Sequence, residues 1–185
     1  MYATNNNLQA IESRNRVTDS LLTLMKQYFY KDITITQICQ ESQIVRQTFY
    51  RNFDSKDDVL KLSLDNMVEQ YFKEFYKTTD VHGQLEAFFS FMLQRKEFLL
   101  LISKNSLFFM IDETISMNIM KFLNFQQITT MVEPKLEKYV TGFIAATICS
   151  LLSLWVDNGF TESPEMLSKL AQRFLGGLRQ HRATA

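Results

Sequence analysis

The sequence predicts an all-α protein of about nine helices, in which an N-terminal three-helix unit with a helix-turn-helix precedes a larger helical C-terminal domain. Its 185 residues include 5 Gly and 2 Pro, against 16 Phe and 9 Met. This composition favours packed helices, and no sustained alternation of apolar and polar residues indicates strands. A chain of this length forms one or at most two small domains and buries roughly 70% of its unfolded surface.

The first expected helix spans about Leu8–Phe29, after a polar start. The helix-turn-helix follows in Thr34–Phe53, which reads as two short helices joined by a tight turn. Thr34 is a favourable N-cap, and Gln37 stands at the spacing that completes a capping box. Both features place the start of a helix directly after Thr34.

The second short helix is expected over Val45–Phe53. Phe49 and Phe53 stand four residues apart and are expected to point inward, which leaves the outer side to long hydrogen-bond donors such as Arg46. A short helix of this kind suits insertion into a DNA major groove. The alternative interpretation is an αα-corner on the surface of any helical bundle.

A family resemblance favours the first interpretation. The segment QIVRQTFYRNFDSKDDVL resembles the signature of TetR/AcrR-family transcriptional regulators, and TITQIC resembles the stretch before the turn. The matching positions are Ile44, Thr48, Phe49, Tyr50, Phe53, Lys56 and Leu60. The resemblance has motif strength over about residues 8–65 and extends further only as a helical pattern.

Three positions depart from the family signature. Gln43 replaces the turn glycine, so a backbone position with positive φ is expected at a residue that tolerates it poorly. Val45 replaces the usual small capping residue, and Asn52 replaces the usual histidine. These departures bear on the geometry of the turn and on base preference.

The resemblance implies a set of DNA-contacting residues by matching positions. Base edges are expected for Thr36, Arg46 and Gln47, and a thymine methyl group for Val45. Phosphates are expected for Thr34, Thr48, Tyr50, Asn52 and Lys56, and either kind of contact for Arg51. In a homodimer, two such heads would meet successive major-groove faces of a roughly palindromic operator, about 34–36 Å apart.

The charge balance excludes a general attraction to nucleic acid. The chain has 20 Lys and Arg against 20 Asp and Glu, so no global field draws it to DNA. Within Ser42–Lys56, however, three cations stand against the single acid Asp54. DNA binding must therefore depend on local placement, and dimerisation would supply affinity by doubling the contacts.

The expected domain organisation follows from a polar boundary at Thr78–His82. Ser55 and Asp58 form a second capping box, which starts a long connecting helix to about Lys77. The expected domains are 1–54 for DNA binding, 55–78 for the connecting helix, and 79–185 for dimerisation and effector binding. Three helices are expected near 83–95, 97–104 and 107–126.

Bulky, soft side chains are concentrated in the first part of the C-terminal domain. Such residues at helical spacing form plain core more often than a binding site, yet methionine-rich surfaces adapt to varied ligands. Regulators of the resembled family carry an effector pocket in this domain, so an apolar or aromatic effector is expected by analogy. The candidate lining residues are Phe88, Phe91, Met92, Phe108, Phe109, Met117, Met120 and Phe125.

Tyr139–Val156 is a run of 18 residues without a charge, after a helix start at Glu133-Pro134. The run reaches the length of a membrane span, but its small polar residues and the following Asn158-Gly159 cap favour a helix buried between subunits. Ser163-Pro164 begins a final amphipathic helix. The resembled family dimerises through its last two helices. The expected interface residues are Phe143, Thr147, Leu151, Leu154, Trp155, Leu167, Leu170 and Phe174.

No catalytic arrangement occurs in the sequence: it has no nucleophile triad, glycine-rich phosphate loop or pair of acids in an apolar setting. We therefore expect no enzyme and no cofactor. His82 and His181 lack ligand neighbours at metal-binding spacing, so no metal site is expected. Cys39 and Cys149 lie on apolar helix faces, as buried reduced thiols do in a reducing cytoplasm. With no recognisable leader, a cytoplasmic protein that spans no membrane is expected.

The resemblance implies a sequence-specific DNA-binding transcriptional regulator. By analogy, it would be a repressor that binds its operator as a homodimer and is released by a small-molecule effector. One alternative is an activator, or a regulator controlled by a protein partner without a small-molecule ligand. The other alternative is a helical interaction module that binds no DNA.

Overall fold

The computed structural model describes residues 8–75, 81–122 and 133–176, which divide between two compact units, Met1–Glu69 and Gln70–Ala185. Within these described ranges the chain forms nine α-helices and two short 3-10 helices, and no strand. The prediction of an all-α chain of about nine helices is confirmed.

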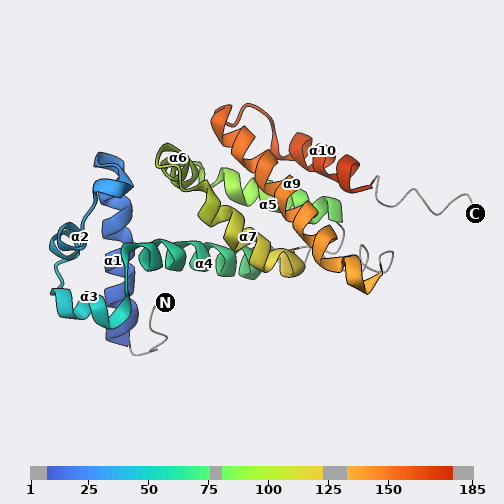
Figure 1. Cartoon of the computed structure of the whole chain (residues 1–185). Helices are drawn as coiled ribbons and strands as arrows, with labels where there is room; N and C mark the ends of the chain where they lie inside the picture. The colour runs from blue at the N-terminus through green and yellow to red at the C-terminus, as the bar shows by residue number, and fades with distance from the viewer. Residues whose placement is uncertain (1–7, 76–80, 123–132, 177–185) are drawn as a thin grey trace, which may run out of the picture. The chain divides into compact units, whose positions relative to one another are not determined.

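The first unit contains the predicted helix-turn-helix. Its elements are α1 (Leu8–Gln27), the 3-10 helix η1 (Tyr30–Asp32), α2 (Ile35–Glu41), α3 (Arg46–Asn52) and the start of α4 (Lys56–Phe75). α2 and α3 both pack on α1 and on each other (Figure 1). The first helix ends at Gln27, two residues earlier than expected, and the 3-10 helix η1 follows it. The side chain of Phe29 is exposed.

Both halves of the predicted capping box are present at the start of α2. The Thr34 hydroxyl accepts from the Gln37 amide at 3.3 Å, and the Thr34 amide donates to Gln37 Oε1 at 2.8 Å. The positive φ expected at Gln43 is also observed, at 54°. The helix-turn-helix therefore has the local geometry that the sequence predicts.

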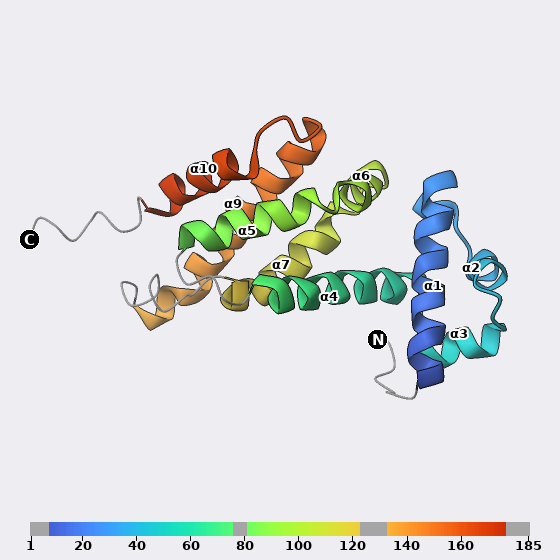
Figure 2. The same ribbon diagram turned by 180° about the vertical axis from the view of Figure 1, so that it is seen from behind.

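The second unit is built around α9 (Glu137–Asp157). Its other elements are α5 (Val81–Leu93), α6 (Lys96–Lys104), α7 (Phe108–Phe122), the 3-10 helix η2 (Pro134–Leu136) and α10 (Pro164–Gly176). α9 packs against α6, α7 and α10, and α10 lies along α5 (Figure 2). The expected helix start at Glu133-Pro134 is thus a 3-10 turn that leads into α9.

Aromatic packing closes the turn between α9 and α10. The indole of Trp155 lies edge-on to Phe89 with ring centroids 5.8 Å apart, and its Nε1 donates to the carbonyl of Glu162 at 3.0 Å. Gly159 has φ 70°, and the amide of Phe160 donates to the carbonyl of Trp155 at 2.8 Å. This is a Schellman closure, with its apolar contact between the Phe160 and Trp155 rings, 5.0 Å apart.

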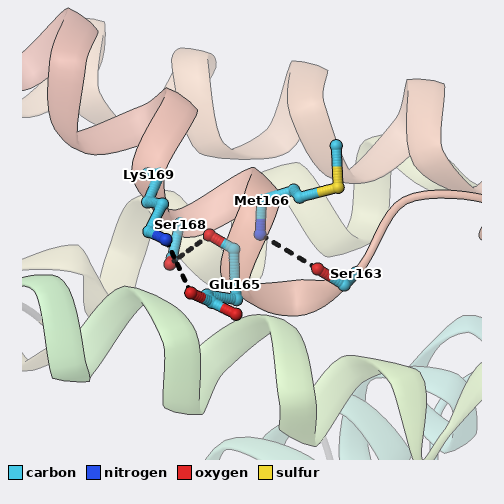
Figure 3. A network of polar contacts seen from close by, with 5 residues as sticks. All are labelled: Ser163, Glu165, Met166, Ser168 and Lys169. Carbon is cyan, nitrogen blue, oxygen red and sulfur yellow. Dashed lines mark hydrogen bonds and ion pairs between the residues drawn. The ribbon is translucent and has the colours of Figure 1, made fainter.

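α10 begins with a side-chain cap, as Ser163-Pro164 predicts. The Ser163 hydroxyl accepts from the Met166 amide at 3.2 Å, and Lys169 pairs with Glu165 at 2.6 Å one turn further on (Figure 3). The hydroxyl of the fully buried Ser168 donates to the Glu165 carbonyl at 2.9 Å. These contacts are local to the first turns of α10 and explain its start.

Candidate nucleic-acid interface

The outer face of α3 carries four long side chains. Arg46 and Tyr50 stand one turn apart, as do Gln47 and Arg51, so the two pairs share one side of the helix. All four are exposed, and Tyr50 retains 50% of its accessible surface. Val45 precedes them as the N-cap and is 67% exposed. The face therefore presents guanidinium, amide and hydroxyl donors beside an apolar methyl group.

The inner face of α3 explains why the outer face is held firmly. Phe49 and Phe53 are 0% and 1% exposed, with ring centroids 5.5 Å apart. The Tyr50 ring meets Phe49 edge-on, with centroids 5.6 Å apart. Burying two phenylalanines contributes about 1.5–3 kcal/mol each. The short helix is thus anchored by packing rather than by its own length.

Three threonines add polar surface beside the outer face of α3: Thr34 is the N-cap of α2, Thr36 lies in its first turn, and Thr48 lies in α3. Thr34 and Thr36 are exposed, and Thr48 on α3 is half-buried. The Thr34 hydroxyl donates to Gln37 Oε1 at 2.8 Å, so part of its hydrogen-bonding capacity is used within the capping box. Thr36 projects from the first turn of α2 without such a role in the cap.

The expectation that Asn52 contacts phosphate is not supported by its position. Asn52 is 5% exposed, and its Nδ2 donates to the carbonyl of Thr48 at 2.8 Å. Its side chain falls on the inner side of α3, beside Phe53, and satisfies the backbone of its own helix. Asn52 is therefore a structural residue in this conformation.

The expectation for Lys56 also needs correction. Its Nζ donates to the carbonyls of Tyr30, Lys31 and Ile33 at 2.6, 3.2 and 2.8 Å. It also lies 4.5 Å from the centroid of the Tyr30 ring. An ammonium group has three hydrogens, and each has a carbonyl acceptor here. Lys56 is engaged within the protein and is not available to a phosphate in this arrangement.

Sequence reasoning missed Tyr30 and Asp57, which complete the surroundings of Lys56. The Tyr30 hydroxyl donates to Asp57 Oδ1, and Tyr30 is 7% exposed. Burial, followed by this hydrogen bond, raises the pKa of Tyr30 well above its ordinary value. The two residues lie 27 positions apart in the chain, and no local pattern in the sequence links them.

The candidate effector residues do not form one site in the described structure. Phe88, Phe91 and Met92 are buried at 4% or less, and the first two pack against Tyr71 with ring centroids 6.1 and 5.3 Å away. Phe108 is half-buried. The side chain of Met120 and the whole of Phe125 lie outside the described residues.

Two of these candidates are wrongly placed for an interior pocket. Phe109 is 62% exposed and Met117 is 73% exposed on α7. An interior ligand cannot be lined by side chains that point to solvent, so Phe109 and Met117 are not pocket-lining residues in this conformation. The expected aromatic cluster is therefore partly core and partly surface.

A shallow apolar groove runs along α9 and reaches α10. Its volume is about 350 Å³, and it is lined by Phe143, Ala146, Thr147, Ser150, Leu151, Leu154 and Phe174. Phe143, Leu154 and Phe174 are 54%, 61% and 60% exposed. Five of the expected interface residues thus share one groove, and Leu170 on α10 is 39% exposed as well.

Trp155 and Leu167 were expected on the same surface, but this is wrong for the isolated chain. They are 1% and 6% exposed, because both side chains turn into the core of the second unit. Trp155 packs on Phe89 and Phe160 instead. The apolar surface therefore consists of the outward-facing residues of α9 and α10 alone.

α9 is the single described helix that is long and apolar enough to span a membrane by length and composition. Within its most apolar window, 39% of the residues are buried inside the structure. A core helix of a globular protein has the same properties. The exposed apolar face of α9 and the groove beside it are the features that need an explanation.

No group of three potential metal ligands occurs among the described residues. Both cysteines are buried free thiols, as expected. Burial, and next a hydrogen bond to Asp112, raise the pKa of Cys149; burial also raises the pKa of Cys39, which Arg46 opposes. Raised thiol pKa values oppose a nucleophilic role.

The chain is all-α, its helix-turn-helix presents the outer face of α3 to solvent, and a separate helical unit follows. This is the architecture of a transcriptional regulator. Residues 79–177 match a family model described as "Transcriptional regulator C-terminal region", of the TetR type. That match spans more than half of the chain. The chain belongs to the TetR family of transcriptional regulators.

Three solved structures share the fold. A TetR transcriptional regulator from Streptococcus agalactiae 2603V has a TM-score of 0.67 and 18% identity, covering 90% of this chain and 95% of its own. The fatty acid degradation regulator FadR from Bacillus halodurans has a TM-score of 0.57 and 16% identity, covering 92% and 96%. The dihydroxyacetone kinase operon activator DhaS has a TM-score of 0.57 and 21% identity, covering 90% and 96%.

At these identities the structural likeness concerns the fold alone. No curated protein matches the sequence significantly. The family assignment therefore depends on the C-terminal match, together with the helical architecture that the three structures share.

Proposed function

We propose that the protein is a sequence-specific transcriptional repressor that binds a roughly palindromic operator as a homodimer. Each α3 would lie in a major groove, with the two half-sites about 34–36 Å apart. The main support for the proposal is that α3 has one buried apolar side and one exposed polar side. Phe49 and Phe53 are fully buried, while Arg46, Gln47 and Arg51 are exposed together.

The hydrogen-bonding groups on this face of α3 suggest which part of the DNA each residue contacts. Arg46 suits a guanine, whose O6 and N7 accept from a guanidinium, and Gln47 suits an adenine. Thr36 is a further candidate for a base edge, and the exposed methyl groups of Val45 suit a thymine methyl group. Phosphate contacts are proposed for Thr34, Thr48 and Tyr50, and either kind of contact for Arg51.

The α9 groove supports the homodimer. Its outward residues Phe143, Leu154 and Phe174 would leave a contiguous apolar surface in water, which marks an interaction site. A second copy of the chain offers the same surface, as a two-fold interface requires. Leu154→Glu should shift the protein to monomer in sedimentation experiments. Leu100→Glu, at an exposed leucine on α6, should leave the association unchanged.

The function itself is tested by selecting genomic DNA fragments with the purified protein. The selected DNA and random DNA are then compared by fluorescence anisotropy over a range of salt concentrations. A regulator binds the selected DNA at least about a thousandfold more tightly than random DNA. Failure to bind either DNA in low salt would favour the helical interaction module.

Activation is the second candidate output. One protein with this fold is named an operon activator, which supports activation as an alternative to the proposed repression. Transcription in vitro from a promoter next to the selected site separates the two outputs. Addition of the protein lowers the transcript level if it represses and raises that level if it activates.

A small apolar or aromatic effector is proposed to bind the second unit and weaken DNA binding. The large share of Phe and Met in this unit supports the idea, since such side chains adapt to varied ligands. Cell extract that releases the protein from DNA should keep this property after passage through a small-pore filter. Loss of the releasing activity on the filter would instead indicate a protein partner.

A further inference from the structure

The first turn of α4 holds both ends of the helix-turn-helix. On one side, Lys56 gathers the carbonyls of Tyr30, Lys31 and Ile33, with Nζ–O distances of 2.6, 3.2 and 2.8 Å. Ile33 directly precedes Thr34, the N-cap of α2. Lys56 therefore fixes the segment from which α2 starts, although it lies more than 20 positions further along the chain.

Tyr30 strengthens this connection. Its ring lies under the Lys56 ammonium, with 4.5 Å between Nζ and the ring centroid, and its hydroxyl donates to Asp57. A cation over a desolvated aromatic face is attracted by the ring quadrupole. Two consecutive residues of α4 thus contact one buried side chain of η1, through both its ring and its hydroxyl.

Asp58 holds the other end of the helix-turn-helix. Its Oδ2 accepts from the amides of Asp54 and Ser55, both at 3.1 Å, and its own amide donates to the Ser55 hydroxyl at 3.2 Å. Asp54 follows Phe53, the C-cap of α3. Three consecutive residues of α4, Lys56 to Asp58, therefore contact both the entry to α2 and the exit from α3.

We propose that this first turn of α4 is the element that positions the helix-turn-helix, and that Lys56 acts as a positioning residue rather than as a phosphate ligand. The inference depends on the proposed DNA-binding function. The proposal follows from the contacts of the ammonium group. To reach a phosphate, Lys56 would give up its hydrogen bonds to three backbone carbonyls, of which that of Tyr30 would keep the amide of Ile33 as a donor at 3.2 Å. Unsatisfied carbonyls are costly where the surroundings are partly buried.

The test compares Lys56→Met and Lys56→Arg with Lys61→Met, a matched removal of an exposed lysine one turn and a half along α4. Hydrogen exchange is followed at the Ile38 amide, which donates to the Thr34 carbonyl at 3.1 Å, and at the Leu21 amide in α1. If Lys56 positions α2, Lys56→Met should lower the protection of the Ile38 amide from exchange by about tenfold more than that of the Leu21 amide. Lys61→Met should change neither amide.

DNA binding of the same variants gives the second readout. If Lys56 positions the helix-turn-helix, Lys56→Met should weaken operator binding by about tenfold. The slope of the logarithm of the binding constant against the logarithm of salt concentration should not change. Arginine should not restore binding, because a planar guanidinium does not match three convergent carbonyls. A slope reduced by about one, retention of binding in Lys56→Arg and unchanged Ile38 protection would overturn the inference.

Tyr30→Phe keeps the proposal testable if Lys56→Met does not fold. It removes the hydroxyl that donates to Asp57, keeps the ring, and should lower Ile38 protection by about threefold, whereas Tyr28→Phe, at an exposed tyrosine, should not. Equal protection in both variants would count against the inference. Hydrogen exchange needs no DNA, so a wild-type protein that binds no DNA would refute the proposed function and leave this result intact.

Discussion

The amide of Ile44 donates to the carbonyl of Cys39 at 3.0 Å, five residues back along the chain. This bond closes α2 with a Schellman motif and forces Gln43 into the left-handed region, with φ 54°. A side chain with a Cβ is strained there, whereas glycine is not. The turn that orients α3 is thus made by a residue poorly suited to its backbone conformation.

Gln43→Gly is accordingly expected to stabilise the protein by about 0.5–1 kcal/mol, measured by urea unfolding. Ser106→Gly provides a matched variant, because Ser106 closes α6 with φ 57° in the same way. Gln40→Gly lies inside α2 and should instead destabilise by about 1 kcal/mol. A destabilising Gln43→Gly would contradict the assignment of strain to this turn.

The local features of this region could be predicted from the sequence. The capping box of Thr34 with Gln37, the capping box of Ser55 with Asp58 and the positive φ of Gln43 all depend on residues within four positions of one another. Short-range hydrogen bonds determine the two capping boxes, so their residue types are informative by themselves. The positive φ at Gln43 was expected because the resembled signature has a glycine at that position, not from the residue type itself. The burial of Phe49 and Phe53 followed from helical periodicity in the same way.

What the sequence could not reveal depends on contacts between distant residues. Lys56 matched a phosphate-binding position, but the carbonyls that bind it belong to residues 23 to 26 positions earlier. Phe109 and Met117 matched a pocket by composition, yet their exposure depends on how α7 packs. Asn52 was assigned to phosphate by its matching position, as a residue expected on the outward or flanking side of the helix. Its inward direction emerges only when α3 is seated on its phenylalanines.

Alkaline pH should destabilise the protein. Burial raises the pKa of Tyr71 to about 12, and burial with the Asp112 hydrogen bond raises the pKa of Cys149. The folded state then holds protons that the unfolded state releases, so the stability contributed by these groups is complete below their unfolded pKa values and declines above them. The decline should begin near pH 8.5 for the thiol and near pH 10 for the phenol.

Urea unfolding at pH 8, 9 and 10 measures this effect. Each group contributes a slope of at most about 1.4 kcal/mol per pH unit. Cys149→Ala should flatten the dependence between pH 9 and 10, whatever its effect on absolute stability. Parallel curves for the wild type and Cys149→Ala in that interval would show that the thiol does not contribute.

Gly142 on α9 offers a probe of the dimer. It is exposed in the single chain, and a Cβ added there meets nothing within 4 Å. Gly142→Ala should therefore stabilise the isolated helix by about 0.5–1 kcal/mol. If α9 packs closely on a second copy, the added methyl group should weaken association by about tenfold.

Sedimentation equilibrium and thermal unfolding at several concentrations separate these two effects. Ser116→Ala, an exposed substitution on α7, serves as the control and should leave association unchanged. A Gly142→Ala protein that associates as tightly as the wild type would place the dimer contact elsewhere on the surface.

If α3 reads DNA bases through its exposed face, Arg46→Ala should impair binding to the operator specifically. Affinities for selected operator DNA and for random DNA are measured at the same salt concentration, with Arg173→Ala, an exposed arginine on α10, as control. Base readout by Arg46 predicts a loss of about 1–3 kcal/mol on the operator and a much smaller loss on random DNA. Equal losses on both DNAs, or no loss on either, would contradict it.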